Sequence, residues 1–109
     1  MALKMSTKLK NVMNDSIKTA LAAGVIKIYS GSQPANADAA PTGTLLGTVT
    51  VGSGAFTHGV STNGIDFDSS SGGVLTKAAA EVWSFVAVAT GTAGWFRHIG
   101  NAADSEAVD

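Results

Sequence analysis

Histidines and paired aspartates are the residues of this 109-residue chain whose types could support catalysis or metal binding. His58 and His98 lie far apart in the sequence, and no close histidine pair exists. A zinc site built on them would need Asp66 or Asp68 to join them in space. Nothing in the spacing favours this, so we predict no metal site. We expect His58 in an exposed loop and His98 in a strand at a surface or interface.

Asp66 and Asp68 alternate along a strand-like segment and therefore share a face. Paired carboxylates can do acid–base chemistry or bind calcium. However, the calcium-loop pattern is not completed, because Ser70 and Gly72 follow and no glutamate closes the loop. Capping of turns is therefore the role predicted for both aspartates.

The remaining chemical motifs are incomplete or missing. The chain contains no G-x-S-x-G nucleophile elbow and no glycine-rich loop followed by G-K-[ST]. It has no cysteine, which excludes disulfides and cysteine-based metal sites. We therefore predict that the protein is not an enzyme, with no catalytic residues, no cofactor-binding residues and no cofactor.

Composition indicates a packing surface rather than a charged one. Charged residues make up 14% of the chain and hydrophobic residues 45%, and the net charge is −1. These values exclude a clustered basic surface for binding nucleic acid. No apolar stretch approaches the roughly 20 residues of a membrane span. The first segment is basic (Lys4, Lys8, Lys10) and the last is acidic (Asp104, Glu106). These ends could pair between copies or simply be solvated.

An amphipathic helix is predicted at the N-terminus. Ser6 or Thr7 suits the N-cap, and Gly24 is placed to end the helix with a positive φ. The apolar residues follow helical spacing and form one stripe: Leu9, Val12, Met13, Ile17, Ala20 and Leu21. A single helix of this length is marginal alone, so the stripe must lie on a sheet or on another subunit. A membrane-surface helix is the alternative, but the stripe lacks Trp and Phe.

Strands are predicted after the helix. Residues 25–29 and 45–51 are rich in β-branched side chains, and residues 65–67 could form a short strand. Residues 82–89 are apolar on both faces and are predicted to be a central strand, with 95–99 pairing back as a hairpin. The sequence therefore predicts one domain over residues 1–109: an N-terminal helix (1–24), a β-domain (25–99) and a polar tail (100–109). The predicted fold is mainly β, an antiparallel β-sandwich or partly open β-barrel that a neighbouring subunit could complete.

Three sequence pieces resemble small virion proteins of tailed bacteriophages and prophages. They are the helix leading into Ile26-Lys27-Ile28-Tyr29-Ser30-Gly31-Ser32-Gln33-Pro34-Ala35, the stretch Ala37 to Leu46 with Thr42-Gly43-Thr44-Leu45-Leu46, and Ala87 to Arg97 with Gly94-Trp95-Phe96-Arg97. Together they cover about half the chain. Similar chains continue past the last of these pieces into further strands. Here a polar tail follows, so either the domain is complete or a neighbour supplies strands.

The resemblance implies a structural part of a phage particle, on the capsid, neck or tail, made in the host cytoplasm and located in the virion. Its partners would be other virion proteins and further copies of itself, without nucleic acid or membrane. The residues predicted to form contacts, with residues 32–43 as a docking arm, are Trp83, Trp95, Phe96, Arg97, Gln33 and Pro34.

The alternative function is a carbohydrate-binding or adhesive β-sandwich module on a phage fibre or cell surface. It depends on the aromatic residues Trp83, Phe85, Trp95 and Phe96, which could form a stacking platform if they were exposed. Because they occupy the most strand-like part of the chain, we expect them in the core or at a subunit interface.

Overall fold

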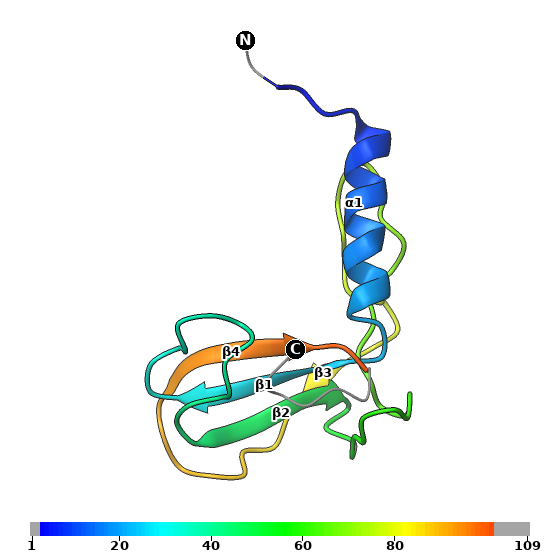
Figure 1. Cartoon of the computed structure of the whole chain (residues 1–109). Coiled ribbons are helices and arrows are strands. Elements are labelled where there is room, and N and C mark those ends of the chain that lie inside the picture. The colour runs from blue at the N-terminus through cyan, green and yellow to red at the C-terminus, as the bar shows by residue number, and fades with distance from the viewer. Residues whose placement is uncertain (1–2, 102–109) are drawn as a thin grey trace.

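A computed structural model describes residues 3–101 as one helix and a four-stranded antiparallel sheet with the strand order β3-β2-β1-β4 (Figure 1). The elements are α1 (Thr7–Ala20), β1 (Val25–Ser30), β2 (Leu45–Val51), β3 (Trp83–Ser84) and β4 (Ala93–Ile99). The prediction of a mainly β fold with one N-terminal helix is confirmed, and the sheet is open rather than closed into a barrel. Most of the predicted polar tail, residues 102–109, lies outside the described residues.

Helix α1 begins where the sequence predicts and ends earlier. Ser6 is the N-cap, and its hydroxyl accepts a hydrogen bond from the Leu9 amide at 3.1 Å. The helix ends at Ala20, and Ala23, rather than Gly24, takes a positive φ of 51°. The role predicted for Gly24 is therefore wrong. Gly24 serves close packing, because a Cβ there would overlap the Ile99 carbonyl oxygen.

The sheet is centred on β1, which pairs with β2 on one side and β4 on the other. Two predictions are wrong here. Residues 95–99 do not form a hairpin with 82–89, since β4 pairs with β1, and the predicted central strand is reduced to the two-residue edge strand β3. The β2–β3 ladder ends at Ser84, and beyond it the Phe85 ring packs directly against Gly47, where a side chain would block it. Residues 65–67 form isolated bridges rather than a strand.

One face of the sheet, here called the covered face, is buried beneath the chain's own loops. Its residues are paired by register: Val25 with Ile99, Lys27 with Arg97, and Tyr29 with Trp95. All of these except Lys27 are buried. The Tyr29 and Trp95 rings stack at 4.5 Å. The core of the described chain is therefore concentrated on this face.

The opposite face, here called the open face, carries Ile26, Ile28, Val49 and Phe96. The first three are half-buried and Phe96 is 64% exposed. Phe67 and Trp83 cover its helix-proximal end, where both rings lie against His98. Away from that end, apolar side chains of the sheet reach the surface of the described chain.

Candidate functional site

Helix α1 stands at one end of the sheet and rises away from it, with residues 68–77 running beside it (Figure 1). We call residues 68–77 the docking loop. Asn11 and Asn14 both form hydrogen bonds with the backbone of Gly73. The Gly73 amide donates to Asn11 Oδ1 at 2.8 Å, and Asn14 Nδ2 donates to the Gly73 carbonyl at 3.0 Å. The backbone N–H and C=O of Gly73 are thus both hydrogen-bonded to the helix.

A second set of contacts extends the same polar face along the helix. Asp15 Oδ1 accepts from the Ser70 amide at 2.9 Å and lies 2.8 Å from the Ser70 hydroxyl. Lys18 Nζ donates to Ser69 Oγ at 3.0 Å. The hydrogen bonds from the Ser70 amide and then its hydroxyl lower the pKa of Asp15, since they stabilise the carboxylate. The polar side of α1 therefore binds its own chain.

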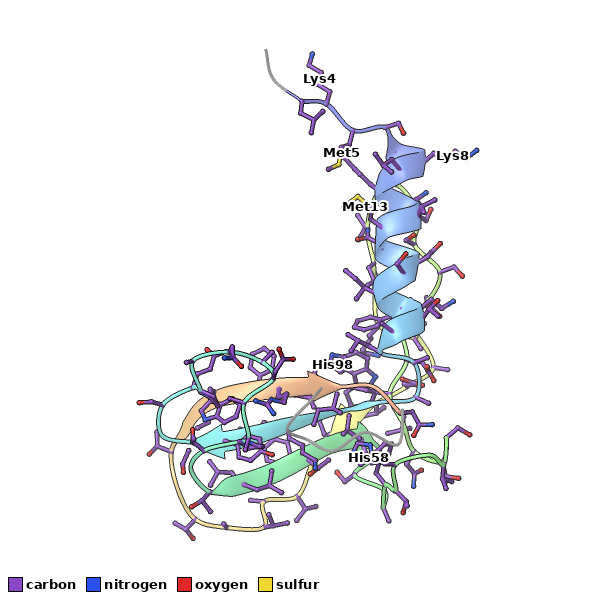
Figure 2. The ribbon with its side chains drawn as sticks, in the orientation of Figure 1. Lys4, Met5, Lys8, Met13, His58 and His98 are labelled. Carbon is purple, nitrogen blue, oxygen red and sulfur yellow. The ribbon has the colours of Figure 1, made fainter. Side chains whose placement is uncertain are left out.

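The apolar stripe of α1 faces the other way. Leu9, Val12, Met13 and Ile17 are 46–55% exposed, and no residue of α1 is buried. Figure 2 shows Met13 on the side of the helix opposite Lys8, turned away from the helix axis. An amphipathic helix usually buries its apolar face against the core. Here that face is uncovered by any of residues 3–101, so it is a candidate interaction surface.

The base of the helix is held against the sheet by close backbone contacts. A Cβ at Gly24 would overlap the carbonyl oxygen of Ile99, and a Cβ at Gly100 would overlap that of Ala20. The Ile65 amide donates to the Gly24 carbonyl at 2.8 Å. Asp66 Oδ1 accepts from the Ala23 amide, also at 2.8 Å. These contacts fix where the stripe points relative to the sheet.

A shallow apolar groove lies on the open face. Its volume is about 440 Å³, and its lining residues are Ile26, Ile28, Ala93, Gly94, Trp95 and Phe96. Ala93 contributes only a methyl group, and the side-chain position of Gly94 is occupied by the Gly31 carbonyl. A groove with an almost wholly apolar lining can bind an apolar side chain or helix face, but it offers few polar groups to orient a small polar ligand.

The predicted contact residues are brought together in part. Gln33, Pro34, Trp95, Phe96 and Arg97 line a groove of about 240 Å³ between the β1–β2 loop and β4. Trp83 lies elsewhere, with its Nε1 donating to Glu81 Oε2 at 2.8 Å and its ring against Phe67 at 5.5 Å. Of the six residues, five therefore share one groove and Trp83 does not.

Two of these residues are buried and make contacts within the chain. Trp95 and Arg97 are 8% and 7% exposed. Arg97 Nη2 donates to the Ala39 carbonyl at 2.8 Å, and its guanidinium lies 5.5 Å from the centre of the Trp95 ring. This pair holds residues 32–43, the predicted docking arm, against β4. Phe96 is the member of the set whose ring is mostly exposed.

The residues considered for chemistry are separated. His58 packs against Phe56 on the side of the covered face, and His98 lies on the open face with Phe67. Burial lowers the pKa of His98 below its usual value of 6.5. Asp66 and Asp68 accept from the amides of Ala23 and Ala79, which lie 43 and 11 residues away, so they join distant segments instead of capping their own turns.

Among residues 3–101, no three or more histidine, cysteine, aspartate or glutamate side chains lie together where they could hold a metal ion. Over residues 3–101, no helix combines the length and the apolar character needed to cross a membrane.

The polar stripe of α1 is a feature that motif reading missed. Asn11, Asn14, Asp15 and Lys18 follow i, i+3, i+4, i+7 spacing, which places them on one face of a helix. That regular spacing of amide and charged groups, opposite the apolar stripe, was the available signal. Its partner, Gly73, lies 59 residues from Asn14 and carries no signal of its own.

Comparisons of the chain with protein-family models, with curated proteins and with solved structures gave no match.

Proposed function

We propose that this chain is a non-enzymatic structural component of a bacteriophage particle that packs in multiple copies on the capsid, neck or tail. The observation that carries the proposal is the orientation of α1, whose polar face binds the docking loop while its stripe stays uncovered. A stripe of this kind is stabilised when a partner removes it from water. Copies of the chain and other virion proteins are the proposed partners.

The resemblance to phage virion proteins supports the particle as the place of assembly. The pieces that carry it form α1 and β1, the β1–β2 loop with the start of β2, and the segment that leads into β4 together with most of β4. They therefore build the helix stripe and line both grooves. Virion parts act through many weak contacts repeated on one lattice, so modest apolar surfaces on each copy are sufficient.

The carbohydrate-binding alternative depended on an aromatic platform formed by Trp83 and Trp95. By register, Trp83 shares the face of Val51 and Ile26, whereas Trp95 shares that of Tyr29. The two indoles therefore lie on opposite faces of the sheet, and Trp95 is buried. This geometry favours assembly over glycan stacking.

The test is to express the tagged full chain in a host producing the phage or prophage that encodes it, and to purify particles on a density gradient. Quantitative mass spectrometry should find the chain in multiple copies per particle. A Met13→Glu variant should fold as the parent does, judged by circular dichroism, yet be depleted from particles. A chain that stays soluble and never co-sediments with particles would contradict the proposed function.

A further inference from the structure

We infer that the stripe of α1 docks on the open face of the sheet in the next copy of this chain, in the groove beside Ile26, Ile28 and Phe96. This inference deepens the proposed function and rests on it for the multiplicity of copies. It names the two surfaces that meet and the way in which copies are joined.

The helix cannot cover the groove of its own chain while its polar face stays bound. The stripe lies opposite the face that Asn11 and Asp15 attach to the docking loop, and the Gly24 contact with Ile99 fixes the helix base. Turning the stripe onto the sheet would break these contacts. Figure 1 shows the helix rising away from the strands rather than lying across them. Within residues 3–101, the helix therefore leaves this groove open to a second copy of the chain.

Charge disfavours the pairing of two helices. Residues 3–24 carry four lysines and one aspartate, a net charge of +3. Residues 25–101 carry three basic and four acidic residues, a net charge of −1 with histidines neutral. Pairing two helices would bring two positive segments together, whereas the groove on the sheet is lined by uncharged residues and does not repel the helix. At the Trp83 margin of the open face, Glu81 Oε2 accepts from the Trp83 indole and the Asp66 amide, and Lys77 Nζ donates to the Glu81 carbonyl, so one carboxylate and one ammonium group lie there.

The dimensions of the two surfaces also agree. Leu9, Met13 and Ile17 are spaced by four residues, or about 6 Å along the helix axis. Ile26 and Ile28 are about 7 Å apart along β1. Successive side chains of the stripe can therefore fit alongside successive side chains of the strand, the geometry of a helix bound in an apolar groove. Ala93, at the start of β4, contributes only a methyl group to the lining of the groove.

Docking a helix on the sheet of the next copy joins two different surfaces. Each copy therefore contributes its helix stripe to one neighbour and its groove to another. Such head-to-tail contacts generate a ring when the rotation closes and a helical array when it does not. Two helices packed about a two-fold axis would instead stop at a dimer. The proposed contact therefore accounts for assembly in multiple copies with a single interface.

The test uses the absence of cysteine in the chain. Full-length Met13→Cys and Phe96→Cys versions, carrying tags of different size, are mixed, oxidised with diamide and separated on a non-reducing gel. The same pair is co-expressed during particle production and oxidised in purified particles. We expect the mixed 13–96 disulfide to dominate. The matched control replaces Met13→Cys with Lys8→Cys, on the other side of the helix, and should give little mixed product.

A dominant 13–13 disulfide would overturn the inference in favour of helix pairing. Absence of the 13–96 product from both the purified chain and the particles would also overturn it. The presence of the chain in particles tests the proposed function independently of this contact. If the chain is abundant in particles without the 13–96 product, the function stands and this contact is wrong. If the 13–96 product forms in the purified chain but the chain is absent from particles, the contact stands and the virion role is wrong.

Discussion

The two sides of helix α1 differ in a way that reverses the usual arrangement of a surface helix. Its polar side is bound to the chain through Asn11, Asn14 and Asp15, and its apolar side is about half exposed. Hydrogen bonds hold the helix in place but do not remove much apolar surface from water. The difference teaches that the polar side serves the fold, whereas the apolar side is available for a partner.

The largest effect on stability is expected at the helix base. Gly24→Ala would drive a Cβ into the Ile99 carbonyl, and forcing such a contact costs about 1–3 kcal/mol of unfolding free energy. Urea unfolding followed by circular dichroism would measure it. The neighbouring Ala23→Gly is the matched control. Ala23 has a φ of 51°, which glycine adopts more easily, so this variant should be neutral or slightly stabilised. Equal losses in both variants would refute the close-packing role of Gly24.

The next effect comes from breaking the polar side directly. The double variant Asn11→Ala, Asn14→Ala removes both side-chain hydrogen bonds to Gly73, each worth about 1 kcal/mol. The higher helix propensity of alanine offsets part of this loss. We expect a net destabilisation of about 1 kcal/mol and faster hydrogen exchange at the Gly73 amide. Unchanged exchange at that amide would show that the asparagines do not hold the loop.

Acid should loosen the same side by a smaller amount. The pKa of Asp15 is lowered in the folded chain, so its stabilising contribution is complete above the ordinary value of 3.8 and is lost as the pH falls through the lowered value. An NMR titration of the Ser70 amide should show a midpoint below 3.8. Asp15→Asn, which cannot titrate, is the control and should flatten the curve. A midpoint at or above 3.8 would contradict the assigned bonds.

The smallest effect on the isolated chain is expected on the apolar side. Leu9→Ser with Met13→Ser changes side chains that are about half exposed, so the unfolding free energy should fall by less than about 1 kcal/mol. The same variant should be depleted from particles. A loss of stability larger than that of the asparagine double variant would mean that the stripe is packed within the chain. Thermal melts of both variants provide the comparison.

Helix α1 and the presence of an antiparallel sheet could be predicted because local signals encode them. Ser6 is a good N-cap, and the spacing of Leu9, Met13 and Ile17 defines one face. Periodicity shows which residues share a face, but not what covers that face. The sequence therefore left open whether the stripe lies on the sheet or on another subunit, and the structure excludes the chain's own sheet.

Strand pairing was less predictable because register depends on contacts between distant residues. Residues 82–89 have strong β-propensity, yet only Trp83 and Ser84 form a strand, and the Phe85 ring that follows packs against Gly47. The same limit applied to the contact residues. Phe96 and Arg97 are neighbours in sequence, but one faces solvent and the other is buried. Strand alternation predicts that Phe96 and Arg97 lie on opposite faces of the sheet. Which of the two faces is buried depends on the loops that cover it.

The central claim, that the stripe of α1 is where the chain meets its partner, is tested most directly by labelling a single cysteine. In Met13→Cys, maleimide should react quickly with the isolated chain and slowly with the chain in purified particles. Ser32→Cys, in the exposed β1–β2 loop, reports whether assembly slows labelling everywhere. The account predicts strong protection of position 13 relative to position 32 in particles. Equal labelling of position 13 in the isolated chain and in particles would contradict it.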